Sequence, residues 1–347
     1  MIVRPAGEIQ MLQAGHDRGR GNLLGVQPWM TSKDYASEEA LSAKLSGYLD
    51  AAHRRGWLSA RTVVVWPEYI GTWLVATGEG RAVWQADTLE GAMRTLVLGQ
   101  PLRFARTWLS SSEKDRVVAS LFRMRGEVIA ELYQAVFSHL AHAYGVTVVG
   151  GSLVLPDPCV DDGRVIAGKG QLYSVSAVFG PDGKAHPALV RKVYPTAAER
   201  PFLASGQLAD LPLFDTPAGR LGVLICADAW YPEPYQRLRE QGAGLVVVPS
   251  YIEKAGAWDA AWRGYDGVSA PDDVDPADVG SLTEAEAWRK YALVGRLTRS
   301  GAEAGLNVFL KGRLWDLGAE GRSVMARAGA TPVEAEDDGP AVLNLWV

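Results

Sequence analysis

The chain has 347 residues, 48% hydrophobic and 22% charged, with a formal net charge of −5 at pH 7, values that favour a globular protein with a large core and argue against nucleic acid as its main partner. No apolar run approaches the roughly 18 residues that a membrane-spanning helix needs, and Met1–Gln10 lacks the charged and apolar regions of a secretory signal. The two cysteines, Cys159 and Cys226, are too few for a disulfide framework and suit a reducing cytoplasm. We therefore expect a cytoplasmic protein, and the lack of a long apolar run argues against a membrane partner.

Buried strands alternate with helices in the first half of the chain. In chain order the sequence predicts the strand Asn22–Met30, the helix Ala40–His53, the strand Arg61–Trp66, the helix Arg123–Tyr144 and the strand Val146–Val149. Ser37 stands before Glu38 and Glu39, which is typical of a capped helix start with an acidic first turn. Residues 78–115 have a less regular pattern and are predicted to be an insertion.

The second half continues the alternation and ends in short strands. The sequence predicts strands at Gln171–Phe179, Ala188–Val190, Gly222–Cys226, Leu245–Val248, Asn307–Leu310, Ser323–Ala326 and Ala341–Leu345, and helices at 232–241 and Glu284–Ala304. The turn residues 181–183 favour a hairpin between the first two of these strands, and Ser281 with Glu284 resembles a capping box. Residues 255–287 are rich in Asp, Gly and Pro, which favours a surface excursion or a pocket lid. We therefore predict one α/β domain over residues 1–347, with insertions near 78–115 and 255–287.

Three chemically capable side chains each follow a predicted buried strand. Glu68 comes after Pro67, Lys192 follows Arg191, and Cys226 ends an apolar run. Side chains at strand ends often face a cleft at the edge of a sheet. Each residue alone also has a simpler interpretation, because free cysteines are often small buried hydrophobes and acids or lysines after strands are often solvated.

The three residue types together suit the hydrolysis of an amide or a nitrile. A thiol must lose its proton before it attacks, and a carboxylate can accept that proton. The attack builds negative charge, which an ammonium group and a backbone N–H can stabilise. The same carboxylic acid can then protonate the departing amine and activate the water that cleaves the thioester.

Three segments carry a resemblance to a known family. In order, 65–69 (VWPEY), 191–195 (RKVYP) and 222–228 (GVLICAD) resemble the Glu, Lys and Cys motifs of the nitrilase superfamily of carbon–nitrogen hydrolases. The resemblance extends from the first strand near Asn22 to Val347. It implies a four-layer α-β-β-α sandwich, and a homodimer or higher homo-oligomer that assembles through helices.

The resemblance also implies a role for each motif residue. Glu68 would be the general base and acid, Lys192 the oxyanion stabiliser and Cys226 the nucleophile, with the backbone N–H of Ala227 completing the oxyanion site. Glu199, seven residues after the lysine, would orient Lys192 and favour its charged form. The alternative for Glu199 is a surface acid at the start of a helix.

The motifs depart from the family pattern in ways that leave the substrate open. True nitrilases typically have Trp-Glu after the cysteine, whereas this chain has Ala227-Asp228. The amide- and carbamoyl-hydrolysing branches often have His two residues after the lysine, where this chain has Tyr194. We expect a small amide or carbamoyl compound as substrate, with a nitrile as the alternative. A catalytically silent binding or scaffold protein on the same fold, and transfer of the acyl group to a soluble amine, are further possibilities.

Other residues complete the expected site. Tyr69, Trp230 and Tyr251 each follow a strand end and are predicted to line the substrate pocket. His139 and His142 lie three residues apart on a helix, but no third ligand is evident, so we expect neither a metal nor another cofactor.

Overall fold

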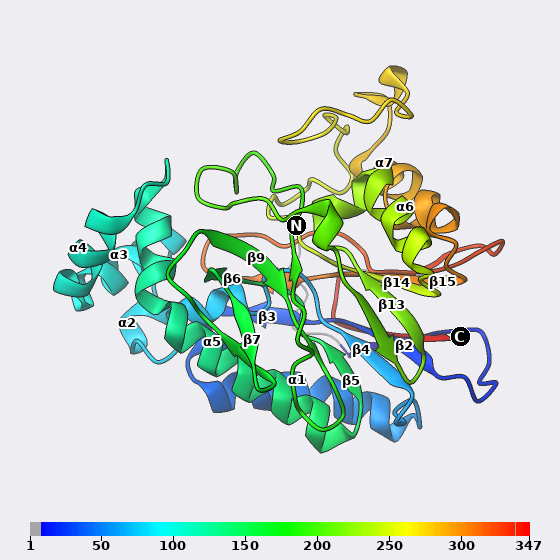
Figure 1. Ribbon diagram of the computed structural model, residues 1–347, viewed down its shortest axis with the longest axis horizontal. Coiled ribbons are helices and arrows are strands. Elements are labelled where there is room, and N and C mark those ends of the chain that lie inside the picture. Colours follow the sequence, from blue (N-terminus) through cyan, green and yellow to red (C-terminus); the bar gives the residue numbers. More distant parts are fainter. Residues whose placement is uncertain (1–7, 337) are drawn as a thin grey trace.

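Two six-stranded mixed sheets form the centre of the fold (Figure 1). The computed structural model describes residues 8–336 and 338–347, so residues 1–7 of the stretch Met1–Gln10 lie outside the described part. In order, the first sheet contains β1 (Gln10–Ala14), β19 (Ala341–Trp346), β2 (Asn22–Gln27), β4 (Thr62–Val65), β5 (Thr147–Val149) and β10 (Val178–Phe179). The second contains β12 (Leu213–Thr216), β13 (Gly219–Val223), β14 (Leu245–Ser250), β15 (Ala304–Phe309), β17 (Val324–Arg327) and β18 (Val333–Glu334).

The central strands of each sheet are parallel. Strand β4 pairs in parallel with β2 and β5, and β14 pairs in parallel with β13 and β15. Three smaller sheets surround this centre: β6 (Leu153–Pro156) with β9 (Leu172–Ser176) and β11 (Val190–Arg191), β3 (Trp29–Thr31) with β16 (Lys311–Arg313), and β7 (Cys159–Asp161) with β8 (Arg164–Ile166). The carboxyl ends of parallel strands lie at one edge of a sheet, where side chains from following loops can meet.

Side chains on the first sheet alternate between two buried clusters. Leu24 and Val64 pack with α1 (Glu38–Arg54) and α5 (Arg116–Tyr144), whereas Leu23 and Val63 pack with residues of the second sheet. A period of two is expected for strands that are covered on both faces. The cluster around the second sheet also includes side chains of α6 (Pro232–Gln241), α7 (Glu284–Tyr291) and α8 (Leu293–Arg296).

Close approach of the two sheets depends on a glycine in β2. A Cβ atom at Gly25 would lie 2.8 Å from Leu306 and 3.0 Å from Val308, both on β15. Real Cβ atoms do not approach carbon atoms so closely, so the absent side chain sets the spacing here. The two mixed sheets and the helices that pack on them confirm the mixed α/β class predicted from the sequence.

Several predicted boundaries are confirmed and others are wrong. Helix α1 begins as expected, since the Ser37 side chain accepts a hydrogen bond from the N–H of Ala40 at 3.2 Å. The predicted first strand is wrong in two ways, because β1 precedes it and Pro28 divides it into β2 and β3. Proline has no N–H to donate to a ladder, which explains the division. The helix predicted at Arg123–Tyr144 starts earlier, where the Asp115 side chain accepts from the N–H of Val118.

Residues 78–115 are helical, contrary to the irregular pattern predicted. They form α2 (Arg81–Trp84), α3 (Leu89–Gly99) and α4 (Pro101–Ser110). The long helix predicted at Glu284–Ala304 is also wrong, since α7 and α8 are followed by a 3-10 turn at Leu297–Ser300. Its capping box is formed by Thr283 and Glu286 rather than by the predicted pair.

The hairpin predicted around residues 181–183 is correct only in part. Strands β9 and β11 pair antiparallel, but β10 between them pairs with β5 of the first sheet instead. The predicted strand Gly222–Cys226 ends earlier, at Val223. Within the part of the chain that the structure describes, no helix is long and apolar enough to cross a membrane.

Candidate active site

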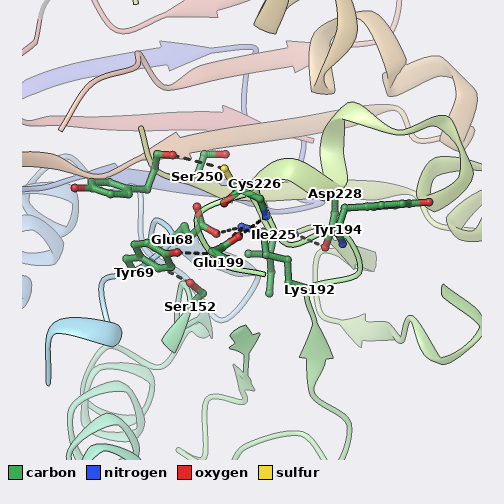
Figure 2. Close-up of polar contacts among 12 residues, drawn as sticks. Glu68, Tyr69, Ser152, Lys192, Tyr194, Glu199, Ile225, Cys226, Asp228 and Ser250 are labelled. Atoms are coloured by element: carbon green, nitrogen blue, oxygen red, sulfur yellow. Dashed lines mark hydrogen bonds and ion pairs between the residues drawn. The ribbon is translucent and has the colours of Figure 1, made fainter. Parts of the chain in front are cut away.

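The loops that follow three strands of three different sheets meet at one buried point (Figure 2). Glu68 follows β4, Lys192 follows β11 and Cys226 follows β13. The ammonium Nζ of Lys192 donates a hydrogen bond to Glu68 Oε1 at 2.8 Å. The Cys226 thiol donates a hydrogen bond to the carbonyl oxygen of Tyr251 at 3.6 Å, and the thiol is close enough to the Glu68 carboxylate for each group to shift the pKa of the other. The three side chains that the sequence singled out therefore lie together, with exposed fractions of 6% for Cys226, 2% for Glu68 and 1% for Lys192.

The backbone is strained at two of the positions that build this point. Cys226 has a φ of 48° and Tyr69, next to Glu68, has a φ of 63°. A left-handed conformation costs a residue other than glycine about 1–3 kcal/mol, and such residues cluster at functional sites. Gly151, just after β5, lets the chain pass close to the turn after β4, because a Cβ there would lie 2.1 Å from the carbonyl oxygen of Pro67. Cys226 opens a 3-10 turn, Cys226–Trp230, which turns the chain from β13 toward α6.

Glu199 is a buried partner of the lysine. Both of its carboxylate oxygens accept hydrogen bonds from Lys192 Nζ, at 2.9 and 2.7 Å. The N–H of Thr196 donates to Oε2 at 2.8 Å, and the hydroxyl of Tyr69 donates to Oε1 at 2.6 Å. Only 3% of Glu199 is exposed, so the alternative of a surface acid is wrong.

Burial and charge set the protonation of this cluster. Burial raises the pKa of Glu68 to about 7, although the Lys192 ammonium acts to lower it. Burial would also raise the pKa of Glu199, but the charge and hydrogen bonds of Lys192 outweigh this effect and hold the pKa below its usual range. The pKa of Lys192 is raised, because the two carboxylates outweigh the opposing effect of burial. Burial, followed by the Glu68 charge, raises the pKa of the Cys226 thiol.

Asp228 is a structural component of the site to which sequence reasoning gave no role. Its Oδ1 accepts hydrogen bonds from the N–H groups of Val193 at 2.9 Å and Tyr194 at 2.8 Å. Its Oδ2 accepts from the N–H of Ile225 at 3.3 Å. One buried carboxylate thus joins the segment after Lys192 to the residue before the cysteine. An acid two residues beyond a buried strand end was the available signal, since such a side chain suits unpaired backbone N–H groups.

The predicted pocket residues have different surroundings. The Tyr69 and Tyr251 rings contact each other with centroids 5.4 Å apart, and the Tyr251 hydroxyl donates to the Gly318 carbonyl at 2.9 Å. Ala227 is half-buried on the turn that begins at the cysteine. Trp230 points into an aromatic cluster, where its ring contacts those of Trp262, Tyr265 and Trp288.

The site has the groups that acyl transfer requires. A thiol whose pKa is raised lies near a carboxylate whose pKa is about 7, and an ammonium group is hydrogen-bonded to that carboxylate. Nucleophile, base and a cation for developing negative charge are the parts of covalent catalysis at a carbonyl. Among the residues that the structure describes, no group of three or more His, Cys, Asp or Glu side chains could hold a metal ion.

Comparison with known proteins gives the same family for the chain. The sequence profile of the carbon-nitrogen hydrolase family matches residues 25–265. Deaminated glutathione amidase from Yersinia enterocolitica is 28% identical over 132 residues, which cover 36% of this chain and 43% of that protein. The bifunctional nitrilase/nitrile hydratase NIT4B from Nicotiana tabacum is 28% identical over 120 residues, 31% of this chain and 34% of that protein. The matched part thus spans less than half the length of either relative.

A solved structure extends the similarity to nearly the whole fold. The NitN amidase from Nesterenkonia sp. AN1 superimposes with a TM-score of 0.55 at 14% identity, covering 94% of this chain and 92% of that chain. At this identity the likeness shows a shared fold only. Because the family profile covers most of the sequence, the chain belongs to the carbon–nitrogen hydrolase family.

Proposed function

We propose that the protein hydrolyses a non-peptide carbon–nitrogen bond of a small amide or carbamoyl compound through a cysteine-bound acyl intermediate. Cys226 would be the nucleophile, Glu68 the general base and acid, and Lys192 the oxyanion stabiliser. The observation that carries the proposal is that the three side chains are buried together: the Glu68 carboxylate accepts a hydrogen bond from Lys192 at 2.8 Å, and its charge acts on the neighbouring Cys226 thiol.

The first half-reaction forms a thioester. Glu68 accepts the thiol proton while the sulfur forms a bond to the amide carbon. Because the pKa of the thiol is raised and that of Glu68 is about 7, the proton moves to Glu68 only as the attack proceeds. The oxyanion that results lies beside the Lys192 ammonium and the backbone N–H of Ala227. Glu68 then gives the proton to the nitrogen, the carbon–nitrogen bond breaks, and ammonia or an amine leaves.

In the second half-reaction water is the nucleophile and the sulfur of Cys226 is the leaving group. Glu68, again a carboxylate, accepts a proton from water as its oxygen attacks the thioester carbon. The carbon–sulfur bond breaks, and the proton returns to the sulfur. The products are a carboxylic acid and the free thiol, so the cycle balances with one water consumed and no cofactor.

An amide is favoured over a nitrile by the residues around the cysteine. The chain has Ala227-Asp228 after the nucleophile instead of the Trp-Glu of true nitrilases. A mutant of the Nesterenkonia amidase, which shares the fold, shows covalent addition of the acetamide moiety of fluoroacetamide at its active-site cysteine. The tobacco relative is a nitrilase, so conversion of a nitrile through a thioimidate is the second candidate.

Ammonia release from a matched panel of amides and nitriles tests the proposal. We expect turnover of amides that is abolished in Cys226→Ala and retained in Cys159→Ala, a control that removes the exposed cysteine. Turnover of nitriles alone would replace the first candidate with the second. No product from any compound, together with stoichiometric alkylation of Cys226, would favour the silent binding protein and contradict the proposal.

We also infer that the chain forms one domain with the four-layer α-β-β-α order of the family. The close approach of Gly25 to β15, and the packing of α1 and α5 against the far side of the first sheet, support this order. Packing of α6, α7 and α8 around the second sheet supports the fourth layer. Homo-oligomerisation and a cytoplasmic location stay predictions from the resemblance and the composition.

A further inference from the structure

The phenol of Tyr69 is the outermost member of the hydrogen-bonded cluster. Tyr69 directly follows Glu68, but its hydroxyl donates to the other carboxylate, Glu199, at 2.6 Å. The N–H of Tyr69 donates to Ser152 Oγ at 2.9 Å, which holds the residue in its left-handed conformation with φ of 63° (Figure 2). A bulky residue is costly in this conformation, so the position of the phenol is maintained against local strain.

The cluster contains two buried carboxylates and only one buried ammonium. Glu68 and Glu199 both accept hydrogen bonds from Lys192 Nζ. Two carboxylates that share one site do not both ionise easily, so the pair holds a proton at a higher pH than an isolated carboxyl does. The chemistry of the site depends on which of the two carries this proton.

The donors around the two carboxylates are unequal. Glu199 accepts from the Lys192 ammonium with both oxygens, from the N–H of Thr196 and from the hydroxyl of Tyr69. Glu68 accepts from the ammonium with a single oxygen, while the thiol of Cys226 donates to the carbonyl of Tyr251. Hydrogen bonds to the charged form favour ionisation, so the unequal donors favour Glu199 as the anion and Glu68 as the carrier of the proton.

We propose that Tyr69 is a positioning residue that keeps Glu199 ionised, so that the exchangeable proton of the pair resides on Glu68, beside Cys226. This inference rests on the proposed function of Glu68 as base and acid. It adds to the predicted role of Tyr69 in lining the pocket, which stays a prediction, because the bond to Glu199 occupies only the hydroxyl. Burial and the neighbouring Glu199 raise the pKa of Tyr69 above its usual value, so the phenol remains a donor throughout the neutral range.

Tyr251 provides a matched control. Its ring contacts the ring of Tyr69 at 5.4 Å, but its hydroxyl donates to the carbonyl of Gly318 instead of a carboxylate. Replacing either tyrosine by phenylalanine removes one hydroxyl from the same aromatic pair. Only Tyr69→Phe removes a donor from Glu199.

The direct test is a carboxyl titration by ¹³C NMR on protein labelled at the glutamate side-chain carboxyls. Glu68→Gln and Glu199→Gln assign the two signals. In the unmodified protein we expect Glu199 to remain ionised at pH values where Glu68 is protonated. In Tyr69→Phe the midpoint of Glu199 should rise by about one pH unit, the size expected for one hydrogen bond to a carboxylate, and in Tyr251→Phe it should stay unchanged. A proton on Glu199 in the unmodified protein, or equal Glu199 midpoints in the two variants, would overturn the inference.

Kinetics give a second readout that separates this inference from the proposed function. Raising the midpoint of Glu199 raises the proton affinity of the coupled pair, so the acid limb of kcat/KM in Tyr69→Phe should move to higher pH, whereas KM should change little. The NMR titration needs no substrate, so it decides the inference even where no amide is hydrolysed. Failure of the proposed function would appear instead as turnover that persists in Cys226→Ala.

Discussion

Asp228 should contribute to stability through the carboxylate that joins the lysine and cysteine segments. Asp228→Ala would leave three N–H groups without their acceptor, two of which make hydrogen bonds of 2.9 and 2.8 Å to Oδ1. Leaving a buried N–H group without its acceptor costs about 1–3 kcal/mol, so loss of the two short bonds predicts a decrease of about 2–6 kcal/mol in the free energy of unfolding. Asp228→Asn can retain Oδ1 and lose only the longer bond of 3.3 Å from Ile225, which predicts a loss of about 1 kcal/mol.

Urea denaturation followed by tryptophan fluorescence measures both losses. The measurement belongs at about pH 6, because burial raises the pKa of Asp228 to about 7 and ionisation of the buried carboxyl at higher pH would offset part of its stabilising effect. We expect similar m-values in the three proteins, so that the midpoints report stability. Equal losses in Asp228→Ala and Asp228→Asn would refute the reasoning, because the shared Oδ1 would then not be the stabilising atom. An alanine variant as stable as the unmodified protein would refute it as well.

Three further predictions concern the ion pairs, the pH dependence and the sheet packing. Lys192→Met leaves the carboxylates of Glu68 and Glu199 buried without their cation, so unfolding should become easier by about 3–5 kcal/mol at pH 8 in urea titrations; unchanged stability would contradict this. Because burial raises the pKa of Glu68 to about 7 and the base must be ionised, kcat/KM should fall as the pH drops below about 7, and a flat profile down to about pH 5 would be inconsistent with a Glu68 base. Gly25→Ala should destabilise the fold by about 1–3 kcal/mol through overpacking between the sheets, which thermal melts would show as a lower midpoint. Gly47→Ala is the control, because a Cβ there meets nothing within 4 Å. It should instead stabilise α1 by up to about 1 kcal/mol.

The strands that support the site were predictable from local sequence. The apolar runs before Glu68 and Cys226 give continuous burial, which is typical of parallel strands covered on both faces. The chemical types of the residues after these strands then indicated the reaction. The resemblance of the three motifs to those of the carbon–nitrogen hydrolase family supplied the prediction that these side chains meet.

The contacts between segments were not predictable in the same way. The bond from Tyr69 to Glu199 and the bridge from Asp228 to Val193 depend on how loops from different sheets come together. No pattern within a single segment of the sequence shows which loops will lie side by side. Trp230 shows the converse, since it lies only four residues after the cysteine but packs into an aromatic cluster with Trp262.

The helical insertion was missed for a local reason. Helices α3 and α4 are short, and their apolar residues Leu98, Leu102 and Leu109 are more than 70% exposed, so an apolar face here does not coincide with a buried one. The available signals were the caps: Thr88 accepts from the N–H of Gly91, and Pro101 occupies the first position of α4. Both are typical helix starts.

Mass spectrometry of the protein quenched during turnover of an amide measures the central feature of the mechanism most directly. A cysteine nucleophile predicts a mass increase equal to the acyl group, confined to the peptide that contains Cys226 and lost in Cys226→Ala. Turnover with no such adduct in a rapid quench, or an adduct that persists in Cys226→Ala, would contradict covalent catalysis by this residue.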